Sequence, residues 1–347
     1  MAVLEANGIN GSSLLGFLAA LGALRLLNEK YSGARLWFDR VSCHARLDVK
    51  HAEQPLAIVD AVVERWHACK RDEEVFLLGI GVVKKAKKDV QTADPGEGKI
   101  AGKPQDMDPA QLQHLVQANR LNRDNLAYLS GLMCDSPKTD KNKSRVEATT
   151  LCALSGSGHQ DLFVTLRDLR NLHAEAKNAR VSTLSKLVQE QQIRRVFCEP
   201  WEFQDAVPRE ASCWMKDRKP TLRWDEGAER LHALRFADPN KDSEPFRTEL
   251  GAYTLASNAL ACLPATPNRR GPLTVSSRSR DGGAVDFFWP LWEIPLTIRA
   301  VKPLLWSGES ERDPDSAQRR GAFRLMRARR LTQGNGKLTF PPAVAVW

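Results

Sequence analysis

The first fifty residues hold the clearest pattern of hydrophobic and polar positions in the chain. Residues 13–31 are apolar on nearly every helical face, which is typical of a buried helix, and Ser12 is the expected N-cap. Residues 34–38 and 44–49 then alternate with the period of two that indicates strands. The pattern therefore predicts a buried helix packed on a small sheet.

The rest of the chain has a more varied pattern of hydrophobic and polar residues. Runs with helical periodicity alternate with charged runs that are typical of exposed loops, and the stretch after residue 196 mixes Trp, Pro and Gly with short strand-like pieces. The expected helices are 55–70, 109–132, 162–176 and 184–196, the expected loops are 84–107 and 136–147, and a short strand is expected at 75–83.

Together these segments predict an α+β, helix-rich fold. We expect an α/β N-terminal region at 1–107, a helical region at 108–196, and an irregular, Trp- and Pro-rich C-terminal region of mixed α/β character at 197–347. A single compact domain is the alternative, because no clear linker separates the three regions.

Composition narrows the class of protein. With 347 residues and 42% hydrophobic content, the chain can bury a full core, which excludes wholesale disorder. The seven cysteines include no C-x-x-C pair, which favours free thiols in a reducing compartment. Residues 14–27 are apolar but short for a membrane span, and no signal-peptide pattern precedes them. We therefore expect a cytoplasmic protein without a membrane partner.

Charge points to acidic partners. Fifty-one Lys and Arg against 42 Asp and Glu give a net charge of +9. Most of the excess lies between residues 316 and 347, where there are seven basic residues and no carboxylate. A smaller excess consists of Lys84, Lys85, Lys87 and Lys88, in a loop that is either a solvated connection or a finger that orders on nucleic acid.

The motifs of common enzyme classes are missing. The seven histidines are dispersed without metal-ligand spacing, and the phosphate-loop signature G-x-x-x-x-G-K-[ST] does not occur. We therefore expect no metal, no cofactor, no catalytic residues and no enzymatic activity.

One short Gly- and Ser-rich stretch could still bind an anion. Ser157, Gly158 and His159 precede a predicted helix, so their amides could cradle a phosphate at its N-terminus. Arg167 and Arg170, three residues apart on that helix, either extend a basic groove or form a solvated face. Because the pattern suggests no orienting carboxylate for His159, structure or phosphate contact is favoured over catalysis.

The C-terminal arginines are the strongest candidate for a binding surface. Arg320, Arg324 and Arg327 have the helical spacing i, i+4, i+7, and Arg330 follows three residues later. Guanidinium groups match phosphate oxygens in geometry, and a merely solvated helix would usually interleave acidic residues. Nucleic acid or an acidic protein is the expected partner.

Several segments resemble a known family in the same order along the chain. They are GFLAALGALRLLNEKYSGARLWFD at 16–39, LSGSGHQDLFVTLRDL at 154–169, VFCEPWEFQD at 196–205, TLRWD at 221–225 and FFWPLWEIPLTIRAVKPLL at 287–305. This series resembles the large-subunit or accessory proteins of type I CRISPR effectors (Cascade), in the subtype I-G group, formerly I-U. The chain is short for a large subunit, and no nuclease or helicase motif of the recruited enzyme is present.

The resemblance implies a non-catalytic, DNA- and RNA-associated subunit of an RNA-guided surveillance complex. Its expected partners are CRISPR RNA, target DNA, the other effector subunits and the recruited helicase-nuclease. In such complexes guide pairing reads the sequence, while protein reads duplex shape and a short motif. The alternatives are a protein–protein adaptor without direct DNA contact, and a nuclease that uses His159.

Overall fold

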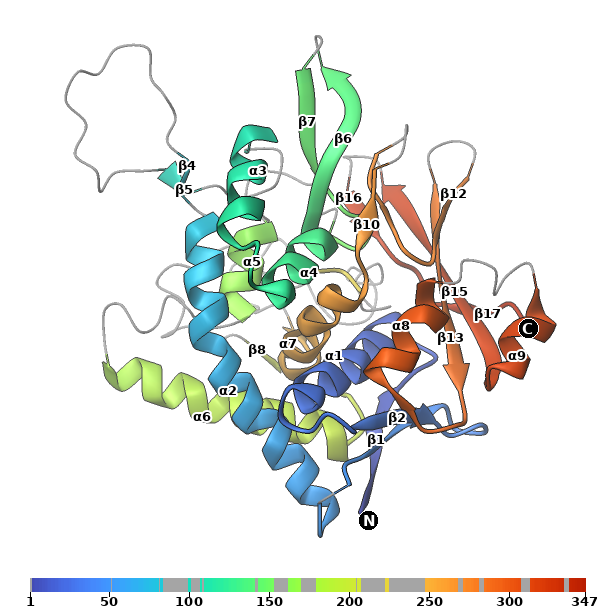
Figure 1. The fold of residues 1–347 in the computed structure, drawn as a ribbon. Coiled ribbons are helices and arrows are strands. Elements are labelled where there is room, and N and C mark those ends of the chain that lie inside the picture. Colours follow the sequence, from blue (N-terminus) through green and yellow to red (C-terminus); the bar gives the residue numbers. More distant parts are fainter. Residues whose placement is uncertain are drawn as a thin grey trace.

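A computed structural model gives the fold (Figure 1). It describes residues 2–50, 52–80, 82–83, 99–100, 107, 109–140, 143–152, 162–169, 179–203, 205–206, 222–224, 247–267, 271–280, 284–306, 313–333 and 337–347. Helices and small antiparallel sheets share these residues, so the fold is α+β, as the sequence predicts.

The N-terminal region is a helix on a small sheet, and this prediction is confirmed. Antiparallel strands assemble in the order β1-β3-β2-β14, and helix α1 contacts β1 and β2. Ser13, and not Ser12, is the N-cap of α1, because its hydroxyl accepts the Gly16 amide at 3.0 Å. The elements are β1 (Val3–Asn10), α1 (Leu14–Lys30), β2 (Arg35–Phe38), β3 (His44–Asp48) and β14 (Leu296–Thr297).

Helix α1 lies at the centre of the core. Every residue from 14 to 27 is buried, including Arg25. Its main partner is α7 (Leu250–Ala259), which it approaches through Gly22: a Cβ there would stand 1.9 Å from the Leu255 carbonyl oxygen. The glycine therefore allows a helix contact that any side chain would block.

The middle of the chain departs from the predictions in three places. Helix α2 (Pro55–Ile80) extends through most of the predicted strand 75–83 and leaves only β4 (Val82–Val83). Residues 109–132 form two helices, α3 (Pro109–Ala118) and α4 (Arg123–Leu132). The expected loop at 136–147 is instead a hairpin that projects from the body, β6 (Met133–Asp140) with β7 (Lys143–Ala148) (Figure 1).

Further helices and short strands complete this part of the structure. Helices α5 and α6 bear out the expected helices at 162–176 and 184–196 as far as the described residues reach. The bounds are β5 (Lys99–Ile100), α5 (Leu162–Leu169), α6 (Ala179–Cys198), β8 (Asp205–Ala206), β9 (Arg247–Thr248), η4 (Leu260–Cys262), β10 (Ala265–Thr266) and β11 (Leu273–Thr274).

Regular structure is present in the described part of the C-terminal region, which the sequence predicts to be irregular. It holds a sheet in the order β12-β13-β15-β16, and β17 pairs with β15. Central strand β13 is buried along its whole length. The bounds are β12 (Ser277–Ser279), β13 (Val285–Trp292), α8 (Ile298–Trp306), α9 (Pro314–Arg319), β15 (Ala322–Gln333), β16 (Lys337–Thr339) and β17 (Val344–Ala345).

Two tryptophans of β13 connect this sheet to the N-terminal helix and sheet. Trp289 stacks on Phe17 of α1 at 5.7 Å and donates its indole N–H to the Gly11 carbonyl. Trp292 donates to the Leu36 carbonyl on β2. A buried indole needs such an acceptor, so these bonds fix where the two layers meet.

Within the described parts of the chain, the structure contains no helix with both the length and the apolar character needed to cross a bilayer.

Candidate nucleic-acid interface

Three of the four C-terminal arginines lie on a strand, so their predicted helical arrangement is wrong. Arg324, Arg327 and Arg330 belong to β15, whereas Arg320 is the C-cap of the short helix α9. Gly321, with φ +89°, separates the two elements. The physical reason is strand pairing: β15 forms a long antiparallel ladder with the buried strand β13, which outweighs the helical spacing of the arginines.

Strand geometry divides these arginines between two faces of the sheet. Side chains on a strand alternate, so Arg327 and Arg329 share one face while Arg324 and Arg330 share the other. The second face meets the core, because Phe287 and Trp289 of β13 lie on it and are fully buried. Only the first face is therefore available for a row of guanidinium groups.

A buried carboxylate organises that first face. Asp286, which is fully buried, stands opposite Arg329 on β15 and opposite Arg278 on β12. Arg329 donates to it through Nε at 2.8 Å and Nη2 at 3.4 Å, and Arg280 donates through Nε at 2.7 Å. We call Arg278, Arg280, Arg327 and Arg329, with Asp286 among them, the arginine face.

The two ion pairs keep Asp286 charged despite its burial. Burial by itself raises the pKa of this carboxyl, but hydrogen bonds and charge from Arg329 and Arg280 outweigh it and hold the pKa below the ordinary value of 3.8. One negative charge thus stands among four positive ones. The Arg280 and Arg329 side chains are 35% and 46% exposed, so they lie at the surface while their partner does not.

Arg327 lies next along the same face. It stands opposite Phe288 on β13 and Val344 on β17 and is half-buried. No hydrogen bond or ion pair joins its side chain to any other residue that the structure describes. Arg320 is exposed at the end of α9 and likewise has no side-chain partner among the described residues. These two arginines are the best placed to meet a phosphate.

The arginines of the opposite face have structural partners. Arg324 donates to the Cys43 sulfur at 3.0 Å, and its guanidinium carbon is 5.8 Å from the Phe323 ring centroid. Arg330 donates to the Thr150 carbonyl at 3.3 Å, and burial lowers the pKa of its guanidinium. Both side chains tie the sheet to the rest of the fold.

Most other predicted site residues fall outside the described residues. This holds for the lysine loop and for the Gly- and Ser-rich stretch: Lys84, Lys85, Lys87, Lys88, Ser157, Gly158, His159 and Arg170. Arg167 lies on α5, and the structure describes its backbone alone. The structure therefore neither joins these residues to the arginine face nor separates them from it.

Two arginines of the face were missed in the sequence. Arg278 and Arg280 stand two residues apart in a short run rich in Ser and Arg. That spacing places both on one face of a strand. The missing information was the order of the sheet. Strand β12 pairs with β13, and the other neighbour of β13 is β15, about fifty residues after Arg278.

Comparison with known proteins does not assign the chain to a family. No family model matches the chain. No curated protein matches it either.

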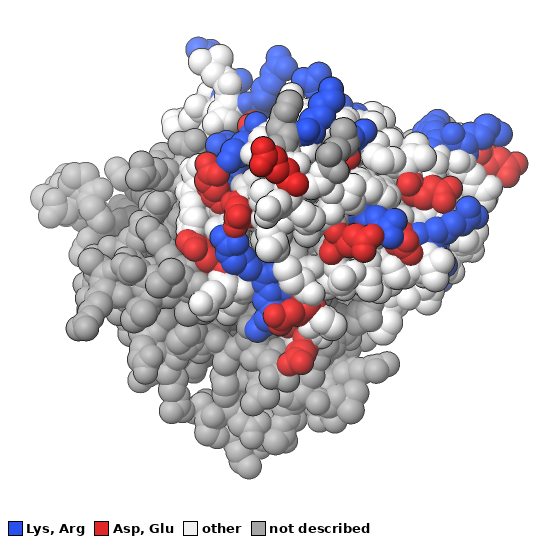
Figure 2. All heavy atoms as spheres, turned by 90° about the horizontal axis from the view of Figure 1, so that it is seen from below, with Lys and Arg blue, Asp and Glu red and all other residues white. Residues whose placement is uncertain are grey.

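The face of the molecule drawn in Figure 2 carries charges of both signs. Figure 2 shows that Lys and Arg alternate on this face with Asp and Glu, and that blue atoms gather mainly at its upper edge and right. The N-terminal layer contains ion pairs between such neighbours, for example Arg46 with Glu5 and Asp39. In the described ranges, no group of three or more His, Cys, Asp or Glu is arranged to hold a metal ion.

Proposed function

We propose that this chain is a non-catalytic, nucleic-acid-binding subunit of a type I CRISPR RNA-guided surveillance complex, in which it contacts target DNA and neighbouring subunits. The observations that carry nucleic-acid binding are the arginine face and Arg320, which is exposed at the end of α9 just before β15. The place in a surveillance complex is supported by the collinear resemblance of five segments spread over most of the chain.

The geometry of the face suits a phosphate backbone. Arg327 and Arg329 are two positions apart on β15, which is about 7 Å at roughly 3.3 Å per residue. Arg278 lies two strands away from Arg329, which is about 10 Å. One DNA strand has a phosphate about every 3.4 Å along the helix axis, so guanidinium groups with these spacings can each meet a different phosphate. Asp286 fixes the two guanidinium groups that it binds, which lowers the entropy that they lose on meeting a ligand.

A salt series with labelled double-stranded DNA, single-stranded DNA and RNA tests the proposal. Each phosphate contact adds about 0.9 to the slope of log affinity against log salt on duplex DNA, and about 0.7 on single strands. The Arg320→Gln/Arg327→Gln variant should therefore lower the slope by about 1.8 on a duplex. The matched control is Arg120→Gln/Arg123→Gln, which removes the same charge from exposed positions around the start of α4.

Two results would overturn the proposal. One is the absence of binding to any of the three nucleic acids at low salt. The other is an equal loss of slope in both double variants, since that would mean a diffuse effect of net charge. Thermal unfolding of each variant shows whether the fold is intact.

A protein–protein adaptor is the second candidate, and a different observation favours it. Apolar side chains lie exposed beside the sheet: Val344 is 47% exposed, Val346 38% and Ile294 44%. Apolar groups rimmed by arginine are typical of protein interfaces. An adaptor would show no crosslink between the arginine face and nucleic acid within the assembled complex.

A further inference from the structure

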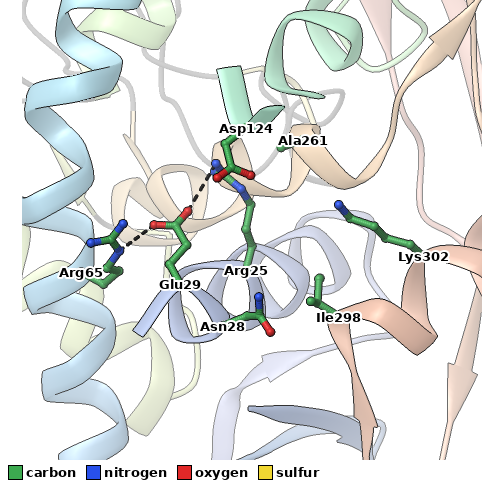
Figure 3. Close-up of a pocket in the computed structure, with 8 residues that line it drawn as sticks. All are labelled: Arg25, Asn28, Glu29, Arg65, Asp124, Ala261, Ile298 and Lys302. Carbon is green, nitrogen blue, oxygen red and sulfur yellow. Dashed lines mark hydrogen bonds and ion pairs between the residues drawn. The ribbon is translucent and has the colours of Figure 1, made fainter. Parts of the chain in front are cut away.

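A polar cavity of about 300 Å³ opens between helices α1, α2, α4 and α8 and the short helix η4 (Figure 3). Five of its lining side chains are charged, and two of the others are apolar. The lining residues are Arg25, Asn28, Glu29, Arg65, Asp124, Ala261, Ile298 and Lys302. Its volume lies at the lower end of the range for small-molecule sites, roughly 300–1,000 Å³.

One of the two carboxylates in the lining is held by arginine. Glu29 receives Arg65 Nε at 2.6 Å and stands 3.4 Å from Arg25 Nη2. Arg25 also donates to the Asn258 side-chain oxygen at 3.4 Å. Figure 3 shows the resulting chain from Arg65 through Glu29 to Arg25 along one side of the cavity. The Glu29 charge is thus neutralised within the protein.

The other two charged groups of the lining have no such partner. Lys302 extends toward the cavity from α8, and Asp124 comes to it from the first turn of α4 (Figure 3). Neither side chain forms a hydrogen bond or ion pair with another residue in the described parts of the structure. An ammonium group and a carboxylate therefore line one cavity without being joined to each other.

Packing alone does not require this charged lining. Arg25 is 8% exposed within a helix that is otherwise buried and apolar from residue 14 to 27. Replacing buried ion pairs by apolar residues of similar volume is often neutral or stabilising. Charges maintained around an open space are better explained by a polar occupant of that space.

We infer that the cavity binds a small phosphorylated polyol, of the size of a pentose phosphate. Three cationic side chains against two carboxylates favour one anionic group, which Lys302 receives. Asp124 and Asn28 offer the oxygen and amide groups that bind hydroxyls. None of the eight described lining residues is aromatic, so the cavity lacks the stacking surface that a nucleobase would need. This inference does not depend on nucleic-acid binding by the arginine face.

Ribose 5-phosphate is the probe, measured by calorimetric titration and by the rise in melting temperature that a ligand of the folded state produces. We expect Lys302→Gln to weaken binding roughly tenfold or more, since a charge-assisted hydrogen bond is lost. Asp124→Asn should weaken ribose 5-phosphate but not inorganic phosphate. Arg299→Gln, exposed on the same helix but outside the lining, should bind as the unaltered chain does.

The outcomes separate the site from simpler explanations. Absent binding of ribose 5-phosphate, or unchanged binding in Lys302→Gln, overturns the inference. Equal affinities for inorganic phosphate and ribose 5-phosphate would reduce the site to an anion site and overturn the polyol part. A preference for 5′-phosphorylated over 5′-hydroxyl RNA that disappears in Lys302→Gln would identify the source of the group as a strand end. No such preference, with ribose 5-phosphate bound, would identify it as a free sugar phosphate.

Discussion

Substitution of Asp286 by Asn should measure how much the buried charge of this carboxylate contributes to the stability of the fold. Removing one partner of a fully buried ion pair costs about 3–5 kcal/mol. Arg280 and Arg329 are 35% and 46% exposed, so water recovers part of that loss, and Asn retains one acceptor oxygen. We therefore expect a loss of about 2 kcal/mol in the free energy of unfolding. At an unfolding entropy of about 2 cal/mol/K per residue, the melting temperature falls by about 3 °C.

The pH dependence gives this prediction its sharpest test. The pKa of Asp286 is lower in the folded chain than its ordinary value of 3.8, so the ion pairs stabilise the fold above that value. Their contribution is lost as pH falls through the folded-state pKa. In scanning calorimetry from pH 7 downward, the difference in melting temperature between Asp286→Asn and the unaltered chain should narrow below about pH 4.

The control for this experiment is Glu53→Gln, an exposed carboxylate without a partner among the described residues. It should leave the melting temperature unchanged at neutral pH. The reasoning is refuted if Asp286→Asn shifts the melting temperature no more than this control. It is equally refuted if the difference stays constant from neutral to acidic pH.

Two further predictions concern packing and thiol chemistry. Gly22→Ala should destabilise the fold by about 1–3 kcal/mol in thermal unfolding, because its Cβ would stand 1.9 Å from the Leu255 carbonyl oxygen. Gly33→Ala, where a Cβ meets nothing within 4 Å, should not, and equal effects would contradict the close helix contact. At pH 8, a thiol reagent followed by peptide mapping should label exposed Cys198 but leave Cys152 unmodified, because burial raises the pKa of Cys152 to about 12. Labelling of both at similar rates in the folded chain would contradict that burial.

The hydrophobic pattern of a segment predicted its secondary structure correctly where the apolar positions are buried in the fold. The apolar run of α1 predicts a buried helix, and the alternation of β2 and β3 predicts strands with one buried face. Both predictions are correct, because burial of these apolar side chains determines the local structure. The hairpin of β6 and β7 has no such hydrophobic pattern, because its sequence is charged and polar. The two strands are held together by backbone hydrogen bonds, which do not depend on the type of side chain.

The arginines show a second limit of sequence reasoning. Their 4- and 3-residue spacings fit a helix, but β15 pairs along β13 and takes the strand conformation. The stretch from 316 to 347 also lacks any acid, which suggested an uncompensated charge. One of its arginines, Arg329, pairs with Asp286, 43 positions earlier, and tertiary structure alone reveals this contact. The cavity, lined by five separate elements, had no sequence signal for the same reason.

The pairing of β14 with β2 has a consequence for synthesis on the ribosome. Leu296 pairs with Leu36, so this edge of the first sheet has to wait for a segment translated 260 residues later. At about 5–20 residues per second, that delay is on the order of 10 to 50 s. During that time the free edge of β2 can pair with other chains, which is a route to aggregation. A chaperone that covers nascent strand edges would therefore raise the yield of folded protein more than one that acts after release.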